Sequence, residues 1–243
     1  MSNLLLDSPE AFYWIGFLLA DGSFYDNRLK LGLSTKDSEH IYRFAKFINY
    51  TGAIDITDKS ISIACKDVEI VGKIRDKFDI RDRKTYNPPS TILKFPRSFL
   101  IALLAGFIDG DGRIANQTNR KDFFLTIKNH ASWVNILQEF NSLICKENFC
   151  KINSNGYAVL TITNTEILKS LKKEVMSLNI PVMKRKWDVI DMDFVSKYVT
   201  SKQLRNKVIQ LYLEGKRNKD ISLECNTSPS NITKIIKSYK ENV

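Results

Sequence analysis

Apolar residues follow two different spacings along the chain, and the change between them predicts the order of its elements. Residues 9–20 are almost wholly apolar, which predicts a buried helix that ends at the Asp21-Gly22 step. Alternating leucines at 29–33 then predict a half-buried strand. The segments that follow predict an amphipathic helix at 37–48, a hairpin at 54–63 and a second amphipathic helix at 68–78.

The same order of elements recurs in the second part of the chain. A helix that begins after Pro96 ends at the Asp111-Gly112 step, 90 residues beyond the first such step. Patterns of a strand, a helix, a hairpin strand and a helix follow at 123–127, 134–140, 159–162 and 167–171. A unit of this size that is present only twice predicts an α+β fold with two pseudo-symmetric halves, each ordered helix–strand–strand–helix–strand–strand–helix. We expect these halves at 1–90 and 91–195.

Residues 201–243 have a different character and predict a small all-α domain. They contain nine Lys or Arg and four Asp or Glu, and so contribute half of the net charge of +10. Their apolar positions fit helices that are interrupted at Gly215 and at 226–228, with a last helix starting at Pro229 or Ser230. This arrangement is typical of a helix-turn-helix, while a basic helical hairpin packed on the main domain is the simpler alternative.

The overall composition narrows the class of partner. A net charge of +10 and a pI near 9.3 indicate a polyanionic partner, most simply nucleic acid. No apolar run approaches the roughly 18 residues that a membrane span needs, and no secretory pattern is present, so we expect an intracellular protein without a membrane partner. The four cysteines lack metal-binding spacing and are expected to be reduced thiols. For His40 and His130 we expect capping or surface roles.

The two Asp-Gly steps place an acid where the helix dipole disfavours it. The C-terminal end of a helix carries a partial negative charge of roughly half a unit, which repels an aspartate. One such step alone is an ordinary turn after a buried helix. Two matched copies, at Asp21 and Asp111, instead predict that a cation offsets the charge.

Small residues in both apolar runs predict that the two helices cross. Gly16 and Ala20 are four residues apart, as are Gly106 and Gly110, so each pair lies on one helix face and allows a close approach of backbones. Such a crossing would bring the two helix ends together. Oxygen ligands there suit Mg²⁺, with Mn²⁺ or Ca²⁺ able to take the same site. The expected metal ligands are Asp21, Asp111 and the carbonyls of Ala20 and Gly110.

The two runs also resemble a known motif. Residues 104–112 read LAGFIDGDG, close to the LAGLIDADG signature, and residues 14–22 read WIGFLLADG, a looser version of it. With the duplicated order of elements over residues 9–190, the chain resembles the single-chain, two-motif LAGLIDADG homing endonucleases. This resemblance implies that the motif helices form the interface between two αββαββα halves. It also implies that Asp21 and Asp111, the final acid of each motif, bind the catalytic divalent metal.

The resemblance further implies a basic residue late in each half that assists catalysis. Lys84 and Lys184 fit this role best, because they follow matching segments of the two halves. Arg83 and Lys186 lie close enough to remain candidates. The first motif has Leu19 where the signature has its earlier acid, a position that is not the metal-binding one.

Antiparallel sheets shaped as saddles contact the DNA major groove in this family. Strand alternation by itself supports contacts from Arg28, Lys30, Thr126 and Lys128. The resemblance adds Ser23, Tyr25, Arg113, Gln117 and Lys121. The polar residues of the last predicted helix that suit groove and phosphate contacts are Ser230, Asn231, Thr233, Lys234 and Lys237.

These observations predict a site-specific homing endonuclease that makes a double-strand break in a long, asymmetric DNA target by Mg²⁺-dependent phosphodiester hydrolysis. The alternative is a non-catalytic nucleic-acid binder, either an intron RNA maturase or a helix-turn-helix transcription regulator. We expect a monomer with double-stranded DNA as its partner and intron RNA as the other partner class. The expected location is the cytoplasm or nucleoid of a bacterial or phage-infected cell, with an organelle matrix as the alternative.

Overall fold

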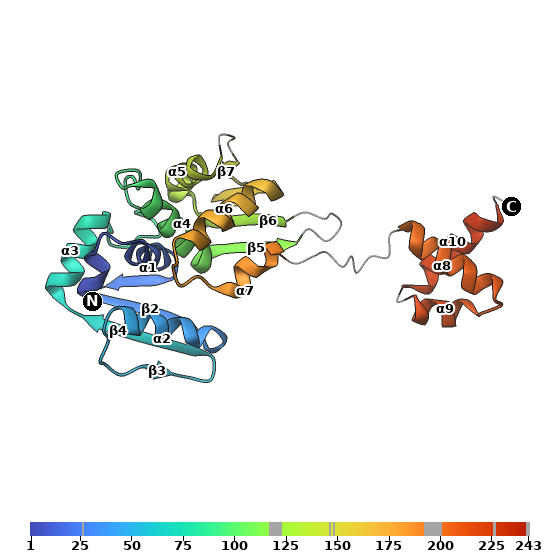
Figure 1. The fold of residues 1–243 in the computed structure, drawn as a ribbon, viewed down its shortest axis with the longest axis horizontal. Helices are drawn as coiled ribbons and strands as arrows, with labels where there is room; N and C mark the ends of the chain where they lie inside the picture. Colours follow the sequence, from blue (N-terminus) through green and yellow to red (C-terminus); the bar gives the residue numbers. More distant parts are fainter. Residues whose placement is uncertain are drawn as a thin grey trace. The chain divides into compact units, whose positions relative to one another are not determined.

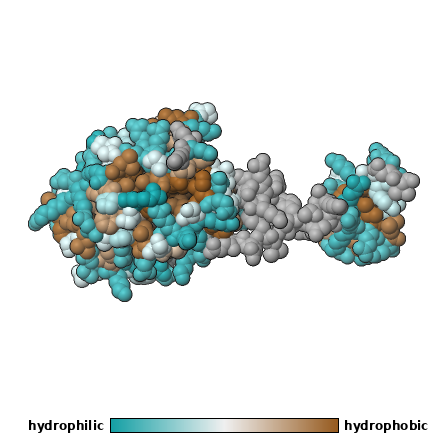
Figure 2. All heavy atoms as spheres, turned by 45° about the horizontal axis from the view of Figure 1, so that its top comes forward, coloured by the Kyte–Doolittle hydropathy of each residue, from teal (hydrophilic) through white to brown (hydrophobic). Residues whose placement is uncertain are grey.

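The computed structural model divides the chain into two compact units, residues 1–192 and 193–243 (Figure 1). It describes residues 1–25, 27–116, 123–145, 147, 149–191, 201–225 and 227–241. Among these residues no helix is both long enough and apolar enough to cross a membrane. In Figure 2 the visible face of each unit mixes hydrophilic residues with several hydrophobic areas.

The first unit contains the predicted order of elements twice. Its first half consists of α1 (Pro9–Ala20), β1 (Gly22–Tyr25), β2 (Arg28–Ser34), α2 (Ser38–Phe47), β3 (Asp55–Ile56), β4 (Ser60–Lys66) and α3 (Val68–Phe78). Its second half consists of α4 (Arg97–Asp111), β5 (Gly112–Asn116), β6 (Phe123–His130), α5 (Val134–Ile144), β7 (Cys150–Ile152), β8 (Tyr157–Ile162) and α6 (Thr165–Ser177), followed by the short helix α7 (Lys184–Trp187). The predicted α+β fold with two αββαββα halves is therefore confirmed.

Each half contains one four-stranded antiparallel sheet, ordered β1-β2-β4-β3 in the first half and β5-β6-β8-β7 in the second. The two sheets have equivalent registers, because Gly22 pairs with Leu31 and Gly112 pairs with Ile127. Successive residues of β2 alternate between exposed and buried, as expected for a sheet that is covered on one face only. Helices α2 and α3 pack against the first sheet, and α5 and α6 against the second.

Helices α1 and α4 form the centre of the first unit and are buried along nearly their whole length. A Cβ atom on Gly16 would lie 1.8 Å from the carbonyl oxygen of Leu103, and one on Gly106 would lie 1.9 Å from that of Tyr13. Only glycine permits this backbone contact, so the small residues bring the helices together as predicted. The contact continues to the C-terminal ends, where a Cβ atom on Gly110 would lie 2.3 Å from the Cβ of Ala20.

The second unit is a bundle of three helices, α8 (Ser201–Leu213), α9 (Asn218–Glu224) and α10 (Pro229–Lys240). Ser228 caps α10, because its side chain accepts a hydrogen bond from the backbone N–H of Asn231. The helices enclose a small apolar core that consists of Val208, Leu211, Ile221, Ile232 and Ile236. The three helices lie where the sequence pattern predicts them.

Two expectations about titratable residues have different outcomes. The four cysteines are free thiols, as predicted. His130 is a cap, because its Nδ1 accepts a hydrogen bond from the N–H of Ser132. The surface or capping role expected for His40 is wrong: its side chain is buried, and its Nε2 lies 2.8 Å from the hydroxyl of Tyr13. A sequence pattern cannot indicate this contact, because the two residues meet only after α2 packs on α1.

Candidate metal and nucleic-acid site

The predicted acids meet at the C-terminal ends of the two central helices. Asp21 follows the last residue of α1, and Asp111 is the last residue of α4. A Cβ atom on Gly110 would lie 3.5 Å from the carboxyl carbon of Asp21. Burial raises the pKa of Asp21, and it raises the pKa of Asp111 to about 6 with a further contribution from the Asp21 charge. The two carboxylates therefore repel each other across the helix interface.

Lys84 lies at the end of the first helix. It is carried by the segment between α3 and α4, and its Nζ donates hydrogen bonds to the carbonyls of Leu19 (2.6 Å) and Ala20 (2.8 Å). Burial lowers the pKa of this ammonium, while the charges of Asp111 and Asp21 act in the opposite direction. The structure thus brings Lys84 next to the acids, as the sequence comparison of the two halves predicts.

At the second helix end, Lys186 occupies the place that the sequence assigned to Lys184. The Nζ of Lys186 donates to the carbonyls of Ile108 (3.0 Å), Asp109 (2.5 Å), Gly110 (3.1 Å) and Gly112 (2.8 Å). Lys184 begins helix α7 and is exposed. Matching the two halves by chain position favours Lys184 over Lys186. In the structure the second lysine lies on the short helix α7, which turns residue 186 towards the end of α4 and residue 184 towards solvent.

The two ammonium groups supply the positive charge that the helix ends require. The carbonyls of Ala20 and Gly110, expected as metal ligands, each accept a hydrogen bond from a lysine. A carbonyl oxygen has two lone pairs, so this bond still leaves room for a second partner. The two lysines therefore offset part of the negative charge that was expected to require a metal ion. Metal binding by the carbonyls of Ala20 and Gly110 stays a prediction.

The acids nevertheless suit a hard divalent cation that keeps part of its water shell. Among the described residues no group of three His, Cys, Asp or Glu side chains forms a closed metal site. Protein ligation would come from Asp21 and Asp111, with water or phosphate oxygens in the remaining positions, a pattern that Mg²⁺ favours. The mutual repulsion of the two carboxylates fits this assignment, since a divalent cation would relieve it.

A buried hydrogen-bond network surrounds Asp109, the earlier acid of the second motif. Its carboxylate is 2% exposed and accepts bonds from the Tyr13 hydroxyl (2.8 Å), the Met183 N–H (2.8 Å) and the Trp187 indole N–H (2.9 Å). Burial raises the pKa of Asp109 to about 6, against the effect of these bonds, and lowers the pKa of His40 to about 4. Because Met183 and Trp187 flank Lys186, Asp109 fixes the segment that carries this lysine.

Asn129 is a site residue that the sequence reasoning missed. Its Nδ2 donates a hydrogen bond of 2.9 Å to Oδ2 of Asp111. By the register of the sheets, the equivalent residue of the first half is Leu33. A signal for Asn129 was present, because it is a polar residue that continues the alternation of buried apolar residues at 123, 125 and 127.

Each half also holds the segment that carries the lysine of the other half. Asp37, just before α2, accepts two hydrogen bonds of 2.7 and 2.8 Å from the guanidinium of Arg185. Trp133, just before α5, donates its indole N–H to the carbonyls of Lys84 (3.2 Å) and Thr85 (3.1 Å). The two braces come from equivalent positions, although one is an ion pair and the other is a neutral hydrogen bond.

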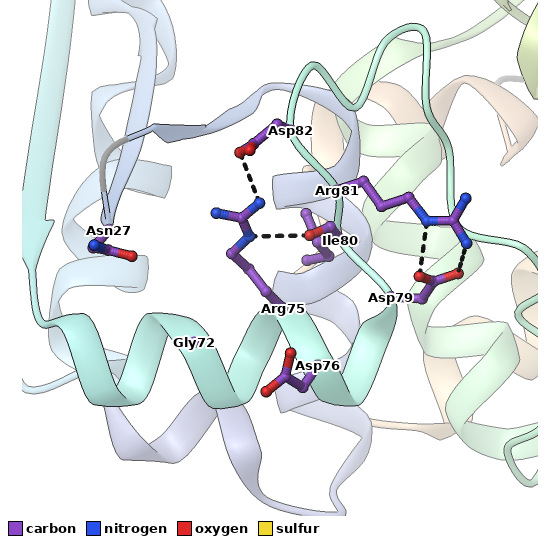
Figure 3. Close-up of a pocket in the computed structure, with 8 residues that line it drawn as sticks. All are labelled: Asn27, Gly72, Arg75, Asp76, Asp79, Ile80, Arg81 and Asp82. Atoms are coloured by element: carbon purple, nitrogen blue, oxygen red, sulfur yellow. Dashed lines mark hydrogen bonds and ion pairs between the residues drawn. The ribbon is translucent and has the colours of Figure 1, made fainter.

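A separate hollow of about 650 Å³ lies beside α3, where that helix gives way to the segment leading to Lys84 (Figure 3). Four of its charged side chains form ion pairs with one another. Arg75 donates to the Ile80 carbonyl and to Asp82, and Arg81 forms two hydrogen bonds with Asp79. Asp79 also accepts bonds from the N–H and the hydroxyl of Ser90, which lower its pKa to about 2. This hollow therefore supports the loop rather than forming a second acidic centre.

The predicted DNA contacts mostly occupy the sheet faces that the helices leave open. Thr126 is half-buried there. The other six are exposed, namely Ser23, Tyr25, Arg28, Lys30, Arg113 and Lys128. Gln117 and Lys121 lie outside the described residues. On α10 the exposed residues are Ser230, Thr233, Lys234 and Lys237. Asn231 is half-buried, and its side chain donates to the Thr227 hydroxyl at 3.1 Å.

Comparison with known proteins gives matches at the level of three-dimensional structure. No protein-family model and no curated protein matches the chain. The LAGLIDADG homing endonuclease I-GzeII in complex with a DNA target is similar over 82% of this chain and 95% of its own, with a TM-score of 0.57 and 14% identity. I-SmaMI bound to an uncleaved DNA target with calcium ions is similar over 73% of this chain and 86% of its own, with a TM-score of 0.52 and 16% identity.

Lysine-to-alanine variants of I-SmaMI, two single and one double, also match. One of the single variants covers 94% of this chain and 97% of its own, with a TM-score of 0.56 and 14% identity. At these identities the likeness concerns architecture, and it agrees with the duplicated halves and the crossing of α1 and α4. The chain has the fold of the LAGLIDADG homing endonucleases.

Proposed function

We propose that the protein is a site-specific DNA endonuclease that makes a double-strand break by Mg²⁺-dependent phosphodiester hydrolysis. The observation that carries this proposal is the pair of acids at two adjoining helix ends, each with a lysine ammonium beside it. The stability of the fold does not explain this arrangement, because burial and mutual repulsion both disfavour the charged form of the two carboxylates. Buried acids with raised pKa values are typical of functional sites.

Asp21 and Asp111 would hold the metal between the two halves. When bound, such an ion activates water, shields a phosphate and stabilises a leaving oxygen. The acids belong to halves with equivalent registers, so each can serve one strand of a duplex. Calcium accompanies the uncleaved DNA target in one I-SmaMI structure, and we expect the same divalent site here, with Mg²⁺ as the ion that supports cutting.

Lys84 and Lys186 would stabilise the charge that develops on the phosphate. An ammonium has three N–H donors, and Lys84 gives two to carbonyls of α1, which leaves one for a phosphate oxygen or a water. Lys186 shares its three donors among four carbonyls. Lys186 must therefore exchange an existing bond before it can contact substrate.

The open faces of the two sheets would bind the duplex. The solved neighbours I-GzeII and I-SmaMI were both captured with DNA targets. The halves of this chain differ in most side chains on the open faces, so we expect an asymmetric target that one monomer recognises. A long target suits two sheets, each of which can follow the major groove.

We propose that residues 201–243 form a helix-turn-helix domain that extends the DNA footprint through phosphate contacts. Its support is the exposed polar and basic side chains of α10 together with a separate small core. Deleting 201–243 should weaken binding and reduce its salt dependence, since fewer counterions are released, while the chemistry of cleavage persists. Equal affinity of the truncated and full proteins at every salt concentration would contradict this role.

The direct test is cleavage of duplex DNA that carries the insertion site of the encoding gene, with Mg²⁺ and then with EDTA. The protein should cut only with the metal ion, and a variant with both Asp21→Asn and Asp111→Asn should bind the same DNA without cutting. Cutting in EDTA, or by the double variant, would refute the mechanism. Binding to intron RNA or to promoter DNA without cleavage of any duplex would instead support the maturase or regulator alternative.

A further inference from the structure

The open faces of the two sheets have equivalent backbones, but the residues at four equivalent register positions differ in chemistry. In the first sheet Tyr25 pairs with Arg28, and Ser23 pairs with Lys30. The residues at the same register positions of the second sheet are Ala115 with Phe124, and Arg113 with Thr126. Because β1 and β5 begin at the helix ends that carry the acids, Tyr25–Arg28 and Ala115–Phe124 lie towards the outer end of each sheet, and the other two pairs lie nearer the acids.

The outer part of the first sheet is a cluster of cations. Arg28 and Lys66 are direct cross-strand partners, and Lys30 lies two residues from Arg28 on the same exposed face. Like charges that face each other across strands destabilise a sheet, so the cluster favours a negatively polarised partner. Within the described part of the chain, none of these three side chains forms an ion pair or a ring contact.

Among the described residues, the outer part of the second sheet carries few charges at the positions that match this cluster. Phe124 and Ala115 are half-exposed on the open face, where alternation would place polar residues. The hydroxyls of Thr126 and Thr161 lie 3.5 Å apart and can satisfy each other. The one cation of this group, Arg113, has its guanidinium 5.7 Å from the centre of the Phe124 ring, which holds it against the aromatic face.

We infer that the two halves of the DNA target differ in composition: guanines lie under the Arg28, Lys30 and Lys66 cluster, and thymines lie under the Phe124 and Ala115 surface. This inference rests on the proposed function and specifies its substrate. Arginine and lysine donate to the O6 and N7 acceptors of guanine in the major groove. Phenylalanine, alanine and the threonine methyl contact the C5-methyl group of thymine there.

The register positions make the assignment specific. Arg28 and Phe124 are equivalent residues, as are Lys30 and Thr126, so the same base-pair step on either side of the target meets a cation or an apolar group. A protein that used its sheets only to hold phosphates would gain from cations at both positions. The uncharged residues Phe124 and Thr126 of the second sheet attract DNA less strongly than cations would. In exchange they offer an apolar contact to the methyl group of thymine.

The test begins with selection of bound sequences from random duplexes by the full chain, with Ca²⁺ in place of Mg²⁺ to preserve the DNA. We expect a selected site with guanines in the outer part of one half and thymines in the outer part of the other. Uracil in place of those thymines removes only the methyl group and should weaken binding by about threefold or more. Replacement of the guanines by 7-deazaguanine removes the N7 acceptor and should weaken binding by about fivefold or more.

Variants assign each effect to its sheet. Phe124→Ala should abolish the uracil effect and leave the 7-deazaguanine effect, and Arg28→Ala should do the opposite, as in a double-mutant cycle. Lys73→Ala on α3 and Met176→Ala on α6 are matched controls, because they remove an exposed cation and an exposed apolar side chain from helices. Both controls should retain both base effects.

Four results would overturn the inference. Selection of a site whose two outer parts have the same composition would refute it, as would a site that is insensitive to uracil; the proposed endonuclease would survive either result. Arg28→Ala that weakens binding to all duplexes equally would show that the cluster contacts phosphates, and would also refute it. Selection of no preferred sequence at all would refute both the inference and the site-specific function.

Discussion

The ends of α1 and α4 share a backbone and an acid, but they differ in what holds the acid and the lysine in place. At the end of α4, Asp111 accepts a hydrogen bond from Asn129, and Lys186 binds four carbonyls. At the end of α1, the residue equivalent to Asn129 is Leu33, and Lys84 binds two carbonyls. The second helix end is thus supported by more polar contacts than the first.

The difference shows which features of the site the fold constrains. The glycine contacts between the helices leave no freedom, since a Cβ atom would overlap backbone atoms. The residues around the acids are less constrained, because an apolar side chain or an amide can fill the same space. Two halves of one chain can therefore keep the same acid positions while the supports diverge.

The largest expected effect comes from removing one acid at a time. Asp21→Asn and Asp111→Asn should each reduce double-strand cleavage by about a thousandfold or more, because an amide no longer offers the charged oxygens that a divalent ion needs. If each acid serves one strand, the single variants should convert supercoiled plasmid to the nicked form. Equal, undiminished linear product from either variant would contradict the paired site.

The next largest effect should come from disrupting the hydrogen-bond network of Asp109, which the first half lacks at Leu19, and it should appear in the free energy of unfolding. Asp109→Leu gives the second motif the residue type of Leu19 and leaves three buried donors without an acceptor, so the free energy of unfolding should fall by about 3 kcal/mol. Tyr13→Phe removes only one of these donors and should cost about 1 kcal/mol. Chemical denaturation measures both. Wild-type stability in Asp109→Leu would mean that the network is dispensable.

Lys186 and Lys84 should differ more in their contribution to the stability of the protein than in their contribution to cleavage. Lys186→Met breaks contacts with four carbonyls and should lower the free energy of unfolding by about 2 kcal/mol, against about 1 kcal/mol for Lys84→Met with its two. Both should slow cleavage. The control is Lys184→Met, which changes an exposed side chain and should affect neither property; a strong loss of cleavage there would restore the assignment made from the sequence.

The pH dependence of stability should distinguish the acids. The pKa of Asp111 and that of Asp109 are raised to about 6 by burial, so the metal-free protein gains stability from their protonation. That gain is complete below the ordinary pKa near 3.8 and is lost as the pH rises through 6. Denaturation without metal between pH 4.5 and 7.5, above the range in which Asp79 titrates, should show this decline. His40, whose pKa burial lowers to about 4, acts in the opposite direction over the same range and offsets about one of the two acids, so a net decline remains.

Addition of a divalent cation and substitution of Asp111 both test whether the pKa of this carboxyl is raised. Mg²⁺ should stabilise the protein more at pH 7 than at pH 5, because it binds the deprotonated carboxylates. Asp111→Asn should flatten the decline seen without metal. A pH profile that is unchanged in Asp111→Asn would show that this carboxyl is not perturbed by its surroundings.

The smallest expected effect comes from making the second half resemble the first. Asn129→Leu removes the hydrogen bond to Asp111 and should slow cleavage of one strand several-fold, with a stability change below about 1 kcal/mol. The converse change, Leu33→Asn, tests whether the first half gains from the same support. Nicking rates on each labelled strand measure both, and identical rates would mean that Asn129 is only a packing residue.

The sequence predicts the fold well because few solutions satisfy its strongest patterns. The glycines at 16 and 106 force a close helix crossing, and the alternation at 29–33 and 123–127 fixes which sheet face is open. Lys84 was found by matching the ends of the halves. The sequence favoured Lys184 and kept Lys186 as a candidate, and the structure places Lys186 at the helix end because the short helix α7 turns consecutive side chains to different sides.

Other site residues depend on contacts between segments that are far apart in the chain. The bond between Tyr13 and Asp109 joins residues 96 positions apart and forms only when α1 and α4 cross. A capping or surface role was predicted for His40 because it lies near the start of a helix, yet its side chain is buried against α1. Periodicity describes one element at a time, so such contacts require the assembled structure.

The braces from Asp37 to Arg185 and from Trp133 to the backbone of Lys84 have a consequence for recombining such proteins. The segment that carries each of the two lysines at the helix ends is held by a residue of the opposite repeat. A chimera that joins one repeat of this chain to a repeat from another protein would keep its acids but lose one anchor. Functional hybrids should therefore require transfer of the residue that precedes the first helix after each hairpin, together with its partner across the interface.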